Sequence, residues 1–115
     1  MSTRHTPLGT VLVDSNGRTL YLFEQDKSTK STCYGGCAGI WPPLTTSPKA
    51  AGGVSAAKLG TSKRTDGTSI VTYGGHPLYT YVGDAAPGDT KGEGLDQFGA
   101  KWYVVAPSGQ KIDKD

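Results

Sequence analysis

The sequence predicts an all-β fold in which two pseudo-repeated antiparallel β units, each a hairpin or meander, form one sandwich-like or partly closed barrel domain. The first observation is internal repetition, because residues 20–26 (Leu-Tyr-Leu-Phe-Glu-Gln-Asp) are echoed by residues 78–84 (Leu-Tyr-Thr-Tyr-Val-Gly-Asp). The second is composition, since 17 glycines and 7 prolines in 115 residues indicate many short elements, long Gly-rich loops and little helix. We expect a single domain over residues 1–115, with unit 1 at about 8–48 and unit 2 at about 59–109.

The first unit is predicted to open with a hairpin. Residues 1–7 are polar and end in proline, so we expect a frayed lead-in. Residues 10–13 are β-branched and apolar, and Ser-Asn-Gly at 15–17 is a tight-turn signal in front of a second strand at 18–23.

That second strand is predicted to lie at the centre of the fold. A period of two places Thr19, Tyr21 and Phe23 on one face, while Leu20 and Leu22 point to the other. Because both faces are apolar, we expect a strand that is covered on both sides.

The two cysteines bracket Tyr-Gly-Gly and predict a short closed loop. An even count in a small, Gly-rich chain favours a Cys33–Cys37 disulfide and an oxidising compartment. By chain entropy a ring of about five residues contributes roughly 2 kcal/mol, so the bridge would mainly shape its own loop. Half of a metal site and a redox-active dithiol are the alternatives.

The Trp-Pro-Pro that follows cannot continue a helix, so we expect Trp41 to fold back and cap the core.

The second unit is predicted to repeat the β pattern after a short helical turn within residues 54–59. Residues 60–65 and 68–73 flank an Asp-Gly turn and are expected to pair as a hairpin. A strand at 77–82 begins with proline, which the first residue of a strand tolerates. The last strong strand is predicted at 101–106.

A long Gly-rich loop at 83–99 takes the place that the cysteine loop has in the first unit. A segment of this length inside a compact domain is typical of functional or disordered loops. Its carboxylates could bind calcium, but the spacing lacks the Asp-x-Asp-x-Asp-Gly pattern, so a solvated loop is favoured. The candidate metal ligands are Asp84, Asp89, Glu93 and Asp96.

Taken together, these motifs resemble a family of bacterial secreted lipoproteins described as tandem repeats of unknown function and marked by a Tyr-x4-Asp motif. The matching pairs are Tyr21 with Asp26 and Tyr79 with Asp84. The surrounding matches, over about residues 8–109, are Gly-Arg-Thr-Leu-Tyr-Leu-Phe (17–23), Cys-Ala-x-x-Trp-Pro-Pro-Leu (37–44), Pro-Leu-Tyr (77–79), Pro-Gly-Asp-Thr (87–90) and Gly-x-x-Trp-Tyr-Val-Val (99–105).

The resemblance implies export and a location that is extracellular or on the outer face of the cell membrane. There the parent protein would be attached through a lipidated N-terminal cysteine, and this is the only membrane contact we expect. The family carries no established activity, so the resemblance leaves the function open.

The motif residues Tyr21, Asp26, Tyr79 and Asp84 allow two interpretations. A buried tyrosine needs a partner for its hydroxyl, and an aspartate at a strand end can fold the next turn through backbone N–H groups, which is a structural role. Alternatively, pseudo-symmetry could bring the two aspartates into one cleft, where they would perturb each other's pKa, hold a hard cation or support hydrolysis.

A core of this size cannot hide all ten aromatic side chains. We expect Tyr34 and Phe98 to be the most exposed, and together with Trp41 and Trp102 they form the predicted binding surface. The contact loops would be those that hold the first two, at 27–40 and 83–99.

These observations favour an exported cell-envelope β domain with a non-catalytic binding or structural role, whose partner is an unknown protein or envelope ligand. No nucleophile elbow and no phosphate loop is present, and no cofactor is expected. A net charge of +2 without a basic stripe argues against nucleic acid. The alternative is a redox or metal-handling accessory protein that uses Cys33 and Cys37 or the acidic loop at 84–96. A hydrolase built on Asp26 and Asp84 is the third hypothesis.

Overall fold

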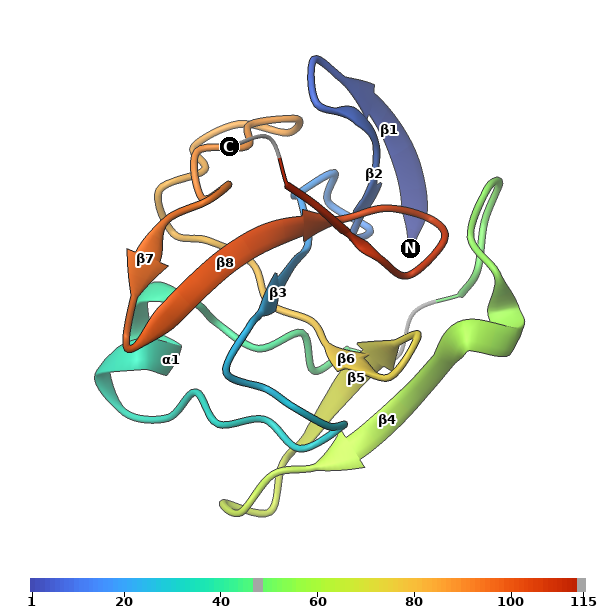
Figure 1. Ribbon diagram of the computed structural model, residues 1–115. Coiled ribbons are helices and arrows are strands. Elements are labelled where there is room, and N and C mark those ends of the chain that lie inside the picture. Colours follow the sequence, from blue (N-terminus) through green and yellow to red (C-terminus); the bar gives the residue numbers. More distant parts are fainter. Residues whose placement is uncertain (47–48, 114–115) are drawn as a thin grey trace.

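A computed structural model of the chain describes residues 1–46 and 49–113 (Figure 1). Within these ranges the regular structure consists of three antiparallel sheets and two short helical segments, with no closed barrel. The predicted all-β class with little helix is therefore confirmed. The predicted end of unit 1, at residue 48, lies outside the described residues.

The first sheet is a hairpin of β1 (Ser2–Thr6) and β2 (Gly9–Val13), paired along their whole length. The expectation of a frayed lead-in at residues 1–7 was therefore wrong. The N-terminal residues are polar because β1 is an edge strand, where charged and hydroxyl side chains face water. The predicted pairing of β2 with the strand that follows it is limited to one bridge, Val13 with Thr19, and the hydrogen bonds beside it.

The second sheet is built around β8 (Ala100–Val105), the predicted last strong strand. On one side β8 pairs with β3 (Tyr21–Phe23), and it also pairs with β7 (Asp96–Gln97) and β9 (Lys111–Ile112). The first unit's central strand thus lies beside a strand of the second unit, with β3 at the centre of the molecule (Figure 1).

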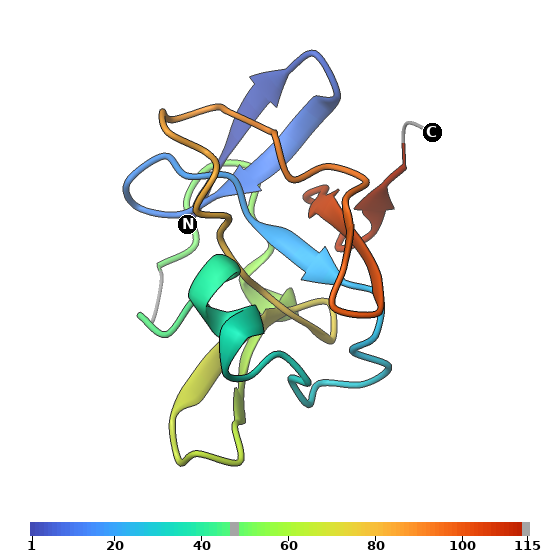
Figure 2. The same ribbon diagram turned by 90° about the vertical axis from the view of Figure 1, so that its left-hand side faces the viewer.

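The third sheet contains β4 (Leu59–Lys63), β5 (Ser69–Tyr73) and β6 (His76–Pro77), in that order. It confirms the predicted second hairpin, and a 3-10 turn at Ala56–Lys58 matches the expected helical turn. In Figure 2 the β4–β5 hairpin projects from the opposite end of the molecule to the β1–β2 hairpin, with β3 between them. Of the predicted strand at 77–82, only Pro77 belongs to a strand, β6, because the chain stops pairing regularly with β5 after this residue.

The repeated Leu-Tyr segments meet each other where β6 ends. The backbone N–H of Tyr21 donates to the carbonyl of Tyr79 at 2.8 Å, and the N–H of Tyr79 donates to the carbonyl of Tyr21 at 3.0 Å. This reciprocal antiparallel bridge relates the two units by an approximate two-fold axis. Both tyrosines are fully buried, as a central position requires.

Two apolar clusters lie on the two faces of β3. Tyr21 and Phe23 belong to one cluster, while Leu20 and Leu22 belong to the other, which confirms the predicted alternation. No helix in the described part of the chain is long and apolar enough to cross a bilayer.

Candidate functional site

The two Tyr-x4-Asp motifs are joined by an exchange of partners. The hydroxyl of Tyr21 donates to Oδ2 of Asp84 at 2.6 Å, and the hydroxyl of Tyr79 donates to Oδ2 of Asp26 at 2.6 Å. All four side chains are buried. Each tyrosine thus bonds the aspartate of the other unit, an arrangement that follows from the two-fold relation of the paired strands.

The second carboxylate oxygen of each aspartate holds the loop that follows it. Oδ1 of Asp26 accepts the backbone N–H of Thr32 at 2.8 Å and the hydroxyl of the same residue at 2.6 Å. Oδ1 of Asp84 accepts the N–H of Lys91 at 2.9 Å. These contacts match the structural interpretation of the motif. They place the two carboxylates in separate hydrogen-bond networks, each with its own tyrosine.

Burial is the largest influence on the pKa of Tyr21, Tyr79 and Asp84. It raises the pKa of Tyr21 and of Tyr79 far above the ordinary value, and the neighbouring carboxylate raises each further, so both phenols remain donors at neutral pH. Burial also raises the pKa of Asp84, while the hydrogen bond from Tyr21 acts in the opposite direction. The tyrosine hydroxyl therefore stabilises a buried negative charge.

Four parallel aromatic rings cross the core beside the tyrosines and form what we call the ring column: Phe23, Trp102, Trp41 and Tyr81. Successive ring centroids are 4.0, 4.0 and 4.4 Å apart, with interplanar angles of 6°, 4° and 26°. The column contains rings from both units, and both tryptophans are fully buried.

The prediction that Trp41 and Trp102 belong to a binding surface was wrong, because each stacks on a ring from the other half of the chain. Trp41 does fold back into the core, but it lies within the column, between Trp102 and Tyr81, so the expectation that it caps the core was wrong.

Gln97 fixes the two indoles, and no sequence signal had singled it out. Its side-chain oxygen accepts the ring N–H of Trp41 at 2.9 Å, and its backbone carbonyl accepts the ring N–H of Trp102 at 3.1 Å. One residue in β7 thereby orients both rings of the central pair.

An apolar patch lies where the ring column reaches the surface. Its members are Ile40, Val82 and Phe98, which are 38%, 51% and 47% exposed and are the exposed large hydrophobic side chains of residues 1–46 and 49–113. All three line one open pocket of about 440 Å³ that also contacts Tyr81 and Gly83. Ile40 and Phe98 lie in the two loops predicted as the contact surface, and the exposure expected for Phe98 is found.

A family model described as a secreted repeat of unknown function matches residues 2–45 and again residues 60–106. The chain belongs to this secreted repeat family. The two matches correspond to the two units that exchange partners, and the description supports the expected extracellular location. Neither the curated proteins nor the solved structures contain a significant match to the chain.

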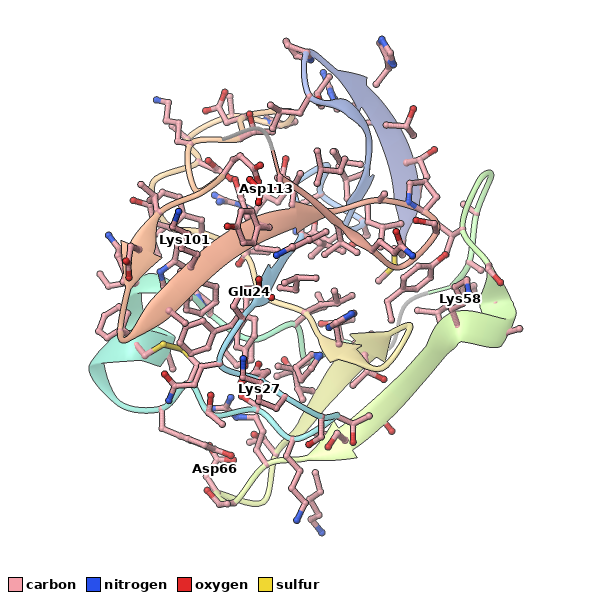
Figure 3. The ribbon with its side chains drawn as sticks, in the orientation of Figure 1. Glu24, Lys27, Lys58, Asp66, Lys101 and Asp113 are labelled. Atoms are coloured by element: carbon pink, nitrogen blue, oxygen red, sulfur yellow. A yellow bond between two sulfur atoms is a disulfide. The ribbon has the colours of Figure 1, made fainter. Side chains whose placement is uncertain are left out.

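The cysteines of this secreted repeat form the predicted Cys33–Cys37 disulfide, which joins α1 (Gly36–Ile40) to the segment before it and is the yellow bond at this helix in Figure 3. The sequence had not predicted this helix. Both sulfur atoms are engaged in the bridge, so neither is a thiol or a metal ligand in this state. The exposure expected for Tyr34 was wrong: this residue, inside the ring, is half-buried because the guanidinium of Arg64 lies 4.2 Å from its ring centroid. The bridge thus shapes a loop that ends at Ile40 of the patch.

In the acidic loop of the secreted repeat, carboxylates accept backbone N–H groups from the loop itself and from β8. Asp89 accepts the N–H groups of Ala85 and Ala86, both at 3.1 Å. Glu93 accepts the N–H of Val104 at 2.9 Å, while Asp96 is exposed. In the described ranges no three His, Cys, Asp or Glu side chains gather as a metal site.

Proposed function

We propose that this secreted domain is a non-catalytic binding module whose contact surface is the apolar patch of Ile40, Val82 and Phe98. The observation that carries the proposal is their convergence on one pocket, although they come from α1, from the segment after β6 and from the β7–β8 turn. Isolated exposed apolar residues are ordinary, whereas several that line one hollow are typical of interaction sites.

The backbone at Phe98 supports the same proposal. Phe98 and Gly99 form the two-residue turn between β7 and β8, with φ values of 58° and 97°. Positive φ at both positions is typical of a type I′ turn, in which Asn-Gly is preferred. The left-handed region costs a residue with a Cβ about 1–2 kcal/mol, so a bulky, half-exposed ring is held there against its backbone preference. Such strain is found mainly at functional positions.

The chemistry of the pocket favours an aromatic side chain from a partner protein. Tyr81, the outermost ring of the ring column, lines the pocket and is half-buried. A Cβ at Gly83 would lie only 2.5 Å from Cε2 of Tyr81, so glycine is needed for the chain to pass this close to the ring. A partner's ring that enters here would extend the existing stack, with about 0.5–1.5 kcal/mol beyond the burial of its area.

Nuclear magnetic resonance titration with two small probes tests this function. N-acetyl-tryptophanamide should shift the resonances of Gly83 and of the Ile40 and Val82 methyl groups, whereas N-acetyl-leucinamide should shift them much less. Phe98→Asn removes the ring and suits the turn, so it should abolish the response, while Phe98→Tyr should keep it. Equal responses to both probes, or shifts scattered over the surface, would contradict the proposal.

We also propose that the parent protein holds this module at the outer face of the cell membrane through a lipid anchor. The support is the resemblance to secreted lipoproteins. Detergent phase partition of the protein from its producing cells tests this: recovery of the protein only in the aqueous phase would refute anchoring.

A further inference from the structure

The oxidisable rings of the core form one continuous set. Trp41 and Trp102 lie face to face, with centroids 4.0 Å apart. The ring of Tyr21 stands edge-on to Trp41 at 5.2 Å, and the ring of Tyr79 stands edge-on to Trp102 at 5.1 Å. Tyr81 extends the stack from Trp41 to the apolar pocket. Contact at these distances lets an electron pass between neighbouring rings without crossing a saturated segment.

Each central tyrosine also carries its own proton acceptor. A phenol that loses an electron becomes a strong acid, so its oxidation is easy only where a base can take the proton at the same time. Oδ2 of Asp84 lies 2.6 Å from the Tyr21 hydroxyl, and Oδ2 of Asp26 lies 2.6 Å from the Tyr79 hydroxyl. Geometry of this kind satisfies the distance requirement for proton transfer.

We propose that these rings and carboxylates form a relay for one-electron oxidation, which accepts an oxidising equivalent at Tyr81 and holds it on Tyr21. An outer-sphere one-electron oxidant at the surface removes one electron through Tyr81 and leaves Trp41 as a radical cation. Tyr21 then reduces Trp41 by one electron, and the Tyr21 phenolic proton moves to Asp84. The products are the reduced oxidant, intact Trp41, a neutral tyrosyl radical and a protonated Asp84, so charge and protons balance.

Electrostatics selects Tyr21 over Tyr79 as the final site. The guanidinium of Arg64 donates to Oγ of Ser31 at 2.7 Å, and that oxygen lies 2.6 Å from the Tyr79 hydroxyl. A fixed positive charge so close opposes the loss of an electron from Tyr79. Each phenol faces its own carboxylate, Asp84 or Asp26. Glu93 adds a second negative charge near Tyr21, which outweighs the cation on that side, because Arg18 donates to the backbone carbonyl of Asp84 and not to the phenol or its carboxylate.

Flash photolysis with tris(bipyridine)ruthenium and a persulfate quencher tests the relay, with radicals followed by transient absorption and electron paramagnetic resonance. In the unmodified protein a tryptophan radical should appear first and convert to a tyrosyl radical, and the conversion should slow in D2O. Tyr21→Phe should abolish the tyrosyl signal, and Asp84→Asn should leave a long-lived tryptophan radical. The control Tyr73→Phe should change neither, because the Tyr73 hydroxyl donates to a backbone carbonyl and lies outside the ring column.

The measurement on the unmodified protein decides the outcome even where a variant does not fold. A tyrosyl radical that forms without a preceding tryptophan radical, a conversion with the same rate in D2O, or a tryptophan radical that never converts would each overturn the relay. The relay does not depend on the binding function, because Ile40, Val82 and Phe98 are not among its rings or carboxylates.

Discussion

Replacing Tyr21 with phenylalanine measures what the exchanged hydrogen bond contributes to stability. The change removes one oxygen and leaves the Asp84 carboxylate, which is 2% exposed, without the donor at 2.6 Å. A hydrogen bond to a charged group contributes about 1.5–3 kcal/mol, and an uncompensated buried charge costs more. Because Asp84 keeps the N–H of Lys91, we expect a loss of about 2–4 kcal/mol in the free energy of unfolding.

The pH dependence of this loss has a definite sign. Burial raises the pKa of Asp84 in the folded protein, and losing the Tyr21 hydroxyl raises it further. Between the unfolded pKa, about 3.9, and the higher folded pKa, the native state binds more protons than the unfolded state. The free energy of unfolding therefore falls as pH rises through that window. The variant should be least destabilised below the window and most destabilised above it.

Denaturant unfolding at neutral pH and across the acid range provides the assay. Tyr73→Phe is the matched control, since its hydroxyl donates to the carbonyl of Pro107 at 2.6 Å and accepts the N–H of Ser55 at 2.9 Å but bonds no charged group. Losing these two neutral hydrogen bonds should cost about 2 kcal/mol. A double-mutant cycle of Tyr21→Phe with Asp84→Asn should show a coupling of roughly 1–3 kcal/mol. Additive effects, or a cost no larger than that of the control, would refute the assignment of stability to this bond.

Three further predictions concern the ring column, the disulfide and the strained turn. Gly92→Ala would place a Cβ 2.6 Å from Trp41, so unfolding should become easier by about 1–3 kcal/mol, whereas Gly39→Ala, with open space around it, should cost little. Replacing both Cys33 and Cys37 with alanine should lower the free energy of unfolding by roughly 2 kcal/mol, and an unchanged denaturation midpoint would show that the ring constrains nothing. Phe98→Asn should leave the melting temperature equal or higher, because relief of about 1 kcal/mol of backbone strain offsets the lost ring; a clear fall would show that the ring belongs to the core.

Local rules were sufficient for β3 and for the β4–β5 hairpin. The alternation of Tyr21 and Phe23 with Leu20 and Leu22 is fixed by strand geometry, so the sequence predicted both faces correctly. The same holds for the disulfide, whose two residues are close in the chain.

Local sequence patterns did not predict the contacts between segments that are far apart in the chain. Trp41 and Trp102 were predicted as surface residues, because the sequence around each tryptophan gives no sign that the other one stacks on it. The same applies to β1, whose polar residues resemble a loose terminus unless the partner strand is known. The repeat predicted two Tyr-x4-Asp motifs, but only the antiparallel bridge between the units determines which aspartate meets which tyrosine.

The crossed bonding of Tyr21 with Asp84 and of Tyr79 with Asp26 has a consequence for ancestry. One repeat unit alone would bury a tyrosine hydroxyl and an aspartate carboxylate that have no hydrogen-bond partner for each other within that unit. Two identical copies would complete each other about a true dyad, so a symmetric homodimer is the simplest precursor of the fused gene product. Severing the linker between the halves should therefore give fragments that reassociate, while either fragment alone stays unfolded.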